Sequence, residues 1–174
     1  SHARTIIHAG RLIDGVSRTA RENVSIIIDA GRIVDVVTGA ARPAEGDEVI
    51  VLSDQTVLPG LMDMHVHLSY QLTPRSYIEE FTLNPADGAI RATHHARITL
   101  LAGFTTVRNV GDDGTVTVAL KRAIAEGFAT GPRIITAGKS IATTGGHADP
   151  TGGWCDALMG DPGARDGVVN GADE

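Results

Sequence analysis

The sequence has very few of the residues on which several protein classes depend. Its 174 residues include one cysteine, Cys155, which excludes an internal disulfide and a cysteine-rich zinc module. Aromatic residues make up 3% of the chain, so the core must consist mainly of aliphatic side chains and Ala. Lys and Arg form no cluster and the net charge is −6, which argues against nucleic acid and an anionic membrane as partners. No apolar run reaches the roughly 18 to 20 residues of a transmembrane helix.

The residues that are present are typical of a globular protein. Hydrophobic residues make up 42% of the chain, charged residues 21%, and glycine occupies 21 positions. Short β-rich runs separated by turn residues fill the first part of the chain, with a hairpin signal at Asp29-Ala30-Gly31. We therefore expect a small antiparallel sheet domain in residues 1–58.

From residue 59 onward, β-rich and helical runs alternate. Asn84-Pro85 and Gly103 are the start and stop signals of the first helix in this part. Strand, helix, strand, helix and strand are expected in turn at residues 61–67, 85–102, 104–110, 116–125 and 133–137. This alternation predicts a parallel sheet with helical crossovers.

Residues 56–68, TVLPGLMDMHVHL, carry the strongest functional signal. Side chains alternate faces along a β-strand, so Asp63, His65 and His67 are expected on one face and the apolar residues between them on the other. Two imidazoles at positions i and i+2 of a strand can bind one cation such as zinc. Because the apolar face suits packing against helices, the pattern predicts the first strand of an α/β barrel with a metal at its mouth. The alternative is two histidines that are hydrogen-bonded within the strand.

Two further residues each admit two interpretations. Asp63 either orients a metal-ligating histidine or accepts backbone N–H groups at the end of the strand. His147 follows Gly145-Gly146 in the long loop after the third strand. It either contacts substrate or moves a proton at the barrel mouth, or it is a solvated loop histidine.

Three segments, PGLMDMHVHL, AGFTTVRNVGD and GPRIITAGKSIATTGGHAD, in this order resemble the N-terminal part of the metal-dependent amidohydrolase superfamily. The TTGGHAD loop is most similar to a branch of imidazolonepropionase-like and Xaa-Pro or Xaa-Arg dipeptidase and carboxypeptidase enzymes, which includes amidases for ochratoxin-type conjugates. The resemblance implies an α/β fold: the first three strand–helix units of a (β/α)8 barrel in residues 59–174. Part of a small β-sandwich domain in residues 1–58 would precede them.

The resemblance also implies chemistry. His65 and His67 would ligate the more buried of one or two divalent metals, usually zinc. His147 would lie near the carboxylate of the substrate, with Arg108 and Tyr70 as further substrate-binding candidates. The reaction would be hydrolysis of a linear amide, in a dipeptide or an N-acyl amino acid, by a metal-activated water. The bridging lysine and the catalytic carboxylate of the family fall on later strands, so no catalytic residue is assigned in this chain.

Other functions share part of this pattern. Cyclic-amide hydrolases and deaminases of the superfamily also carry the HxH strand, and a non-catalytic metal-binding fragment of the same fold is a third hypothesis. A complete barrel needs about 250 residues, so we expect a fragment that requires the remaining barrel strands. We also expect a homo-oligomer in the cytoplasm, with a periplasmic or secreted location after signal removal as the alternative.

Overall fold

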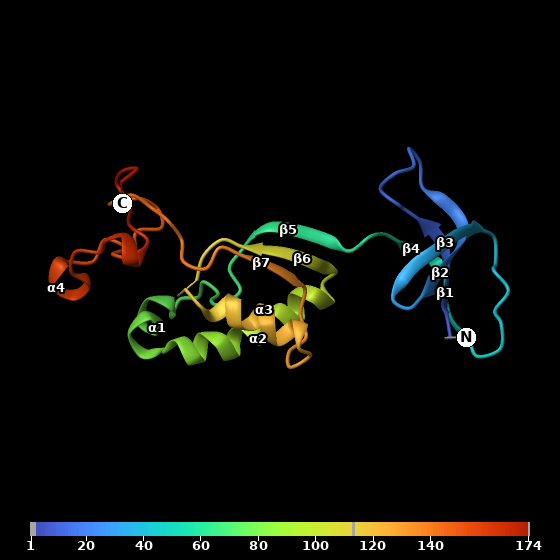
Figure 1. Ribbon diagram of the computed structural model, residues 1–174, viewed down its shortest axis with the longest axis horizontal. Helices are drawn as coiled ribbons and strands as arrows, with labels where there is room; N and C mark the ends of the chain where they lie inside the picture. The colour runs from blue at the N-terminus through green and yellow to red at the C-terminus, as the bar shows by residue number, and fades with distance from the viewer. Residues whose placement is uncertain (1–2, 113, 174) are drawn as a thin grey trace. The chain divides into compact units, whose positions relative to one another are not determined.

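A computed structural model describes residues 3–112 and 114–173 of the chain (Figure 1). The chain divides into two compact units, Ser1–Pro59 and Gly60–Glu174. Within the described ranges, no helix is both long and apolar enough to cross a membrane.

The first unit is a four-stranded sheet in the order β3-β2-β1-β4. Its strands are β1 (Thr5–Leu12), β2 (Arg21–Asp29), β3 (Arg32–Thr38) and β4 (Glu48–Val57). The predicted hairpin is confirmed: β2 and β3 pair antiparallel, and both Ala30 and Gly31 in the turn have positive φ. The sheet is not purely antiparallel as expected, because β1 pairs with β4 in parallel. A parallel pair needs a crossover, which the chain between β1 and β4 supplies as the β2–β3 hairpin and the loop after it.

The second unit has a parallel sheet in the order β5-β6-β7, which confirms the predicted α/β class. Its strands are β5 (Leu61–Val66), β6 (Phe104–Asn109) and β7 (Arg133–Thr136), and its helices before β7 are α1 (Ser76–Thr82), α2 (Pro85–Leu101) and α3 (Val116–Ala125). The helices lie on one side of the sheet (Figure 1). This is the arrangement of consecutive strand–helix units in a (β/α)8 barrel.

The core of this unit lies between the sheet and the helices α2 and α3. Val107 and Ile134 of the sheet are 0% and 2% exposed, and they share a cluster with Ala92, Ala96 and Leu120 of the helices. The alanines let α2 approach the sheet closely, because their side chains end at Cβ. Ala92 and Ala96, both 0% exposed, are therefore the residues of α2 that pack on the sheet.

The strand that carries the histidines departs from regular alternation. Its register with β6 shifts after Asp63, so that two β5 residues, Met64 and His65, lie opposite the single β6 residue Arg108. Such a bulge bends a strand and re-aims its side chains. The prediction that Asp63, His65 and His67 follow one uninterrupted face is therefore wrong at the bulge, because pairing with the neighbouring strand overrides the period of two.

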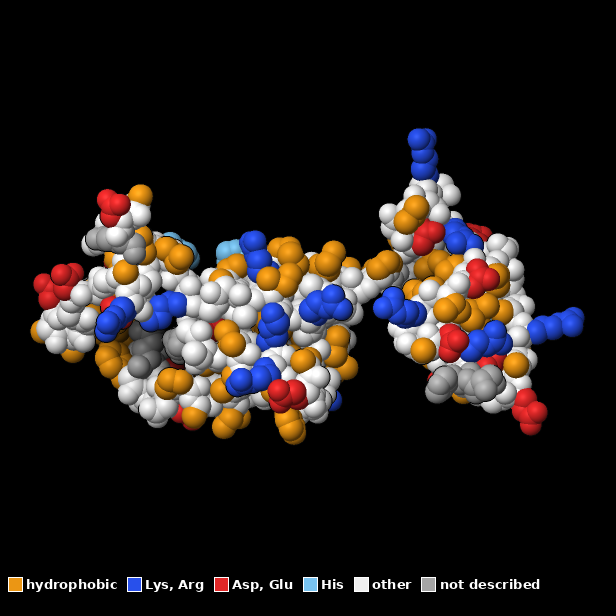
Figure 2. Space-filling view, in the orientation of Figure 1, with side chains coloured by type: hydrophobic (Ala, Val, Ile, Leu, Met, Phe, Trp, Pro, Cys, Tyr) orange, Lys and Arg blue, Asp and Glu red, His pale blue; other side chains and the backbone are white. Residues whose placement is uncertain are grey.

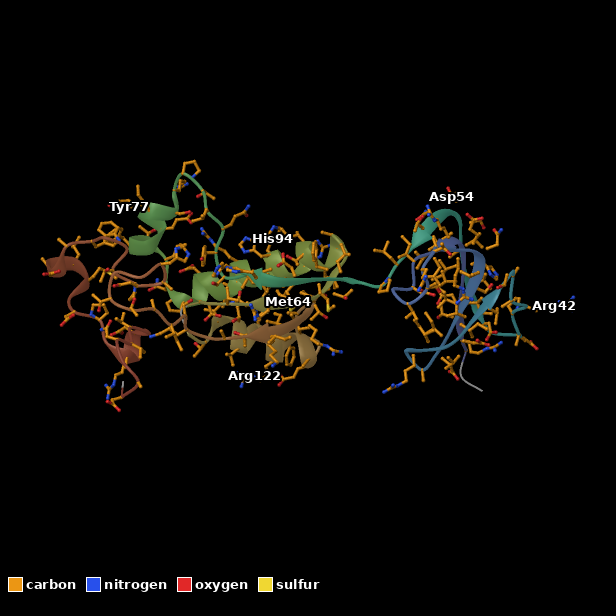
Figure 3. The ribbon with its side chains drawn as sticks, turned by 90° about the horizontal axis from the view of Figure 1, so that it is seen from above. Arg42, Asp54, Met64, Tyr77, His94 and Arg122 are labelled. Carbon is orange, nitrogen blue, oxygen red and sulfur yellow. The ribbon has the colours of Figure 1, made fainter. Side chains whose placement is uncertain are left out.

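The apolar face of β5 is also less buried than expected. Met62 and Met64 are 69% and 41% exposed, whereas Val66 packs against the core. Hydrophobic side chains are visible along β5 in Figure 2, and Figure 3 marks Met64 among them. Ile135 of β7 is 49% exposed as well. The face of the sheet opposite the helices thus presents apolar side chains that other strands of a closed barrel would cover.

The long segment after β7 is anchored by aromatic residues. It contains the short helices α4 (Asp156–Met159) and η1 (Ala164–Asp166), and it is closed by a bridge between Ala142 and Val168. Trp154 stacks on Tyr77 of α1 at a ring-centroid distance of 4.5 Å and meets Phe81 edge-on at 4.8 Å. Figure 3 marks Tyr77 on this helix. Offset and edge-on contacts of this kind contribute about 0.5–1.5 kcal/mol beyond burial, so the cluster ties the segment to α1.

Candidate metal and substrate site

A wide cavity lies where the second unit's strands end at their carboxyl termini. Its volume is about 1330 Å³. The polar side chains that line it include His65, His67, Tyr70, Asp112, Lys139 and His147. His65 lies on β5, and the others come from the segments that follow β5, β6 and β7. This is the end of a parallel α/β barrel at which active sites are built.

The two histidines of the HxH strand lie close together at this cavity. The ring centroids of His65 and His67 are 5.6 Å apart and the rings are inclined at 69°. Two imidazole nitrogens at about 2.1 Å from one zinc ion place ring centres roughly 5 to 6 Å apart. The bulge after Asp63 thus does not separate the pair, and the two rings fit ligation of one cation.

The ring of His67 is held by the backbone. Its Nδ1 lies 3.0 Å from the carbonyl oxygen of Gly111. A carbonyl oxygen only accepts, so Nδ1 is assigned as the protonated nitrogen and Nε2 keeps its lone pair. Tyr70 packs against the same ring at a centroid distance of 5.0 Å. This tautomer leaves the lone pair of Nε2 available for a metal ion.

Asp63 forms one of the two interactions predicted for it, a hydrogen bond with a backbone N–H. Its Oδ1 accepts the backbone N–H of His65 at 3.0 Å. This bond lies across the bulge and stabilises the local bend of the strand. Asp63 therefore orients His65 through the backbone, and a direct hydrogen bond to a ligand ring stays a prediction.

His147 sits in a tight turn that Asp149 holds together. The Asp149 carboxylate is 9% exposed and accepts the backbone N–H groups of Gly145 at 2.6 Å and Thr151 at 2.8 Å. Gly145 has φ +69°, a left-handed conformation that favours glycine at this position. The carboxylate thus ties together residues on both sides of His147, which presents its ring to the cavity.

This turn is expected to depend on pH through Asp149. Hydrogen bonds from the backbone of Thr151, then of Gly145, hold the pKa of Asp149 below its usual range. A lowered pKa in the folded state means that the stabilisation is complete above the usual pKa of Asp, about 4, and is lost as the pH falls through the lowered value. The backbone amides of Gly145 and Thr151 should therefore lose protection against hydrogen exchange in acid, when their rates are compared with the intrinsic exchange rate at the same pH.

Asp149→Asn is the matched variant for this measurement. The amide keeps one acceptor oxygen and does not titrate, so exchange at Gly145 should be faster than in the wild type near neutral pH. In this variant, the protection of the Gly145 amide should also no longer fall in acid. Equal acid dependence in both proteins would show that another group controls the turn.

The remaining predicted substrate residues are placed differently. Tyr70 is 48% exposed and lines the cavity beside His67. Arg108 donates from Nε to the carbonyl oxygen of Met64 at 2.8 Å. Among the described residues, the cavity lining does not include Arg108. A direct contact of Arg108 with substrate stays a prediction.

Sequence analysis missed two residues that organise the site, Asn109 and Asp149. Asn109 is the last residue of β6 and is 0% exposed, and Asp149 ends the TTGGHAD segment at 9% exposure. A polar side chain that follows a buried strand residue, and an Asp two positions after a Gly-Gly-His turn, were the available signals. Neither pattern indicates which backbone groups Asn109 or Asp149 would bond.

The described residues do not form a complete metal centre. They contain no group of three or more His, Cys, Asp or Glu side chains arranged to hold a metal. His65 and His67 therefore fit as two donors of a zinc site that normally has three or four. The donor chemistry fits zinc and similar divalent ions.

Comparison with known proteins identifies the family. The model of the amidohydrolase family matches residues 56–173. The chain is 48% identical to a Xaa-Pro dipeptidase crystallised with methionine in its active site, with a TM-score of 0.88 over 97% of this chain and 41% of that one. It is also similar to a prolidase solved with N-methylphosphonate-L-proline, at 30% identity and a TM-score of 0.71 over 83% of this chain and 34% of that one.

A curated relative points to the same family. Ochratoxinase of Aspergillus niger is 26% identical over 155 residues, which are 83% of this chain and 30% of the relative. The chain thus spans less than half the length of these relatives. The match to residues 56–173 covers more than half of the chain, and these residues include the HxH strand and the His147 turn. The chain belongs to the amidohydrolase family.

Proposed function

We propose that this chain contributes the HxH part of the active site of a metal-dependent hydrolase that cleaves a linear amide. The substrates would be dipeptides or N-acyl amino acids, cut at the bond to the C-terminal amino acid. The observation that carries the proposal is the pair of rings of His65 and His67 at the cavity, with Nε2 of His67 free to ligate. His147 lines the same cavity.

Each of these side chains would have a separate task. His65 and His67 would hold a divalent metal, for which we propose zinc. The metal, when bound, supplies a Lewis acid and a water of lowered pKa. His147, fixed by Asp149, would donate a hydrogen bond to the carboxylate of the amino acid that leaves. Tyr70 would keep the His67 ring in place and form part of the substrate's surroundings.

The remaining parts of the site would come from barrel strands that these 174 residues do not contain. Support comes from the share of the relatives that the chain spans, 41% and 30%, and from the exposed apolar face of the β5-β6-β7 sheet. The catalytic base and further metal ligands would lie on those strands. A homo-oligomer and a cytoplasmic location remain predictions.

The names of the relatives favour linear amides over the other candidate reactions. Two similar proteins are a Xaa-Pro dipeptidase and a prolidase, and a third is ochratoxinase. Greater identity to the dipeptidase, 48% against 26%, makes a dipeptide the first choice and an ochratoxin-type conjugate the second. Cyclic-amide hydrolysis, deamination and non-catalytic metal binding are the alternatives.

The test combines metal analysis with a substrate panel on the complete protein. The protein is purified, its metal content is measured, and it is then stripped with a chelator and reloaded with zinc. The panel contains Xaa-Pro and Xaa-Arg dipeptides, N-acyl amino acids, ochratoxin A, a hydantoin and an aminated nucleobase. We expect about one or two metals per chain and hydrolysis of at least one linear amide that disappears on chelation and returns with zinc.

Three other results would overturn the proposal. Turnover of the hydantoin or the nucleobase alone would assign the protein to cyclic-amide hydrolysis or deamination. Bound metal without turnover of any panel member would favour the non-catalytic hypothesis. Hydrolysis that survives complete removal of metal would exclude the metal-dependent reaction.

A further inference from the structure

We propose that Asn109 is a positioning residue that fixes both the tautomer and the orientation of the His67 ring. The inference deepens the proposed function and rests on it for the role of the metal. It starts from the burial of Asn109, whose side chain is 0% exposed at the end of β6. A buried amide is costly unless its polar atoms are hydrogen-bonded.

The amide of Asn109 bridges the ends of two strands. Its Oδ1 accepts the backbone N–H of Leu68 at 2.8 Å, and its Nδ2 donates to the carbonyl oxygen of Gly111 at 3.1 Å. Leu68 directly follows His67 in the chain, and Gly111 lies in the loop after β6. One side chain therefore holds the backbone beside His67 and the backbone that its ring contacts.

These bonds form a closed circuit around His67. The carbonyl oxygen of Gly111 lies 3.1 Å from Nδ2 of Asn109 and 3.0 Å from Nδ1 of His67. A carbonyl oxygen has two lone pairs and can accept both donors. From the ring of His67, the circuit runs to Gly111, through the amide of Asn109 to the N–H of Leu68, and back along the chain. Moving any member breaks at least one of its bonds.

Neighbouring contacts stiffen the circuit on both sides. The carbonyl oxygen of Leu68 lies 2.8 Å from Nδ1 of His95 on α2. At Gly111, an added Cβ would overlap the side chain of Ser140, so the loop backbone is tightly packed there. Leu68 and Gly111, the two residues that Asn109 joins, are thus each in contact with a further part of the chain, and the amide fixes their separation.

The consequence for His67 is a defined ligand atom. Because Gly111 offers only an acceptor, it favours the Nδ1–H tautomer and leaves Nε2 for the cavity. Partners of this kind behind a ligating histidine, when removed, typically cost about 10- to 100-fold in metal affinity. Asn109 does not contact the cavity, so it acts through Gly111.

The variant Asn109→Asp tests this role with almost no change of volume. Its carboxylate still accepts the N–H of Leu68, but its second oxygen cannot donate to Gly111 and faces another acceptor. We expect Gly111 to move away and His67 to lose its fixed tautomer. Thr136→Val is the matched control, because it removes a hydroxyl that contacts Thr117 and Gly138 at the end of β7, outside the circuit.

The complete protein is measured in two ways. The first uses the ¹⁵N shifts of the His67 ring in metal-free protein, assigned with His67→Asn, and needs neither metal nor activity. The second is the zinc affinity in competition with a chelator. In the wild type and in T136V we expect the Nδ1–H tautomer and equal zinc affinity. In N109D we expect a mixture of tautomers and an affinity lower by about 10- to 100-fold.

The outcomes separate this inference from the proposed function. A wild-type tautomer and zinc affinity in N109D would overturn the positioning role, as would equal losses in N109D and T136V. A wild type that binds no zinc would overturn the proposed function, and the tautomer measurement alone would then decide the inference. If N109D fails to fold, Asn109→Ser, which cannot span from Leu68 to Gly111, is judged by the same criteria.

Discussion

Replacement of His67 by Asn is expected to abolish tight zinc binding and to lower kcat/KM by about a thousandfold. The proposed metal contributes several kcal/mol to the reaction as a Lewis acid, and each 1.4 kcal/mol corresponds to about a factor of ten in rate. Asn is close to His in polarity but cannot place a nitrogen lone pair where Nε2 lies. The measurements are the zinc content after dialysis and kcat/KM for the preferred panel substrate.

His94→Asn is the control for this variant. His94 is an exposed residue of α2 whose ring contacts the neighbouring His95, and it does not line the cavity. H94N should keep zinc content and kcat/KM within about twofold of the wild type, since surface substitutions away from the active site and the core usually have small effects. The idea that His67 ligates the metal would fail if H67N kept both a stoichiometric metal and its activity.

Helix α2 was predictable because its signals are local. Asn84 and Pro85 begin α2 and Gly103, with φ +99°, follows its end, as the sequence indicated. The N–H of Asn84 donates to the carboxylate of Asp87 at 2.9 Å, which completes the start of the helix. Each of these features depends on a few neighbouring residues, so the sequence carries the information directly.

The bulge in β5 was not predictable for the opposite reason. It arises from the register with β6, in which Arg108 faces two residues, Met64 and His65. Which residues pair across strands depends on contacts between distant parts of the chain. The alternation of hydrophobic residues along one strand does not indicate this pairing. The prediction of two adjacent histidine rings nevertheless holds in the structure, because His67 follows the bulge and its ring is directed by Gly111.

The sequence predicted the site residues that line the cavity, but it did not predict the residues that hold them in place. His65, His67 and His147 are residue types that stand out in sequence, and all three line the cavity. Asn109 and Asp149 act through backbone groups, which every residue possesses. Sequence therefore gives no sign of which amide or carbonyl they will reach.

Replacement of His147 by Ala is expected to lower kcat/KM by about 10- to 150-fold, mainly through KM. A hydrogen bond to a charged group is worth about 1.5–3 kcal/mol, and the proposed partner is the carboxylate of the substrate. The loss should therefore depend on that carboxylate. With the corresponding C-terminal amide as substrate, wild type and H147A should differ by less than about threefold, which completes a double-substitution cycle between residue and substrate.

Two further variants show whether the turn matters as well as the ring. His147→Gln keeps an N–H donor and should recover part of the loss with the carboxylate substrate. Asp149→Asn keeps His147 but loosens the turn that Gly145 and Thr151 form around it, so it should raise KM in the same direction by a smaller factor. An equal loss for the carboxylate and the amide substrate in H147A would contradict carboxylate recognition. His147 would then act on a part of the substrate that both molecules share.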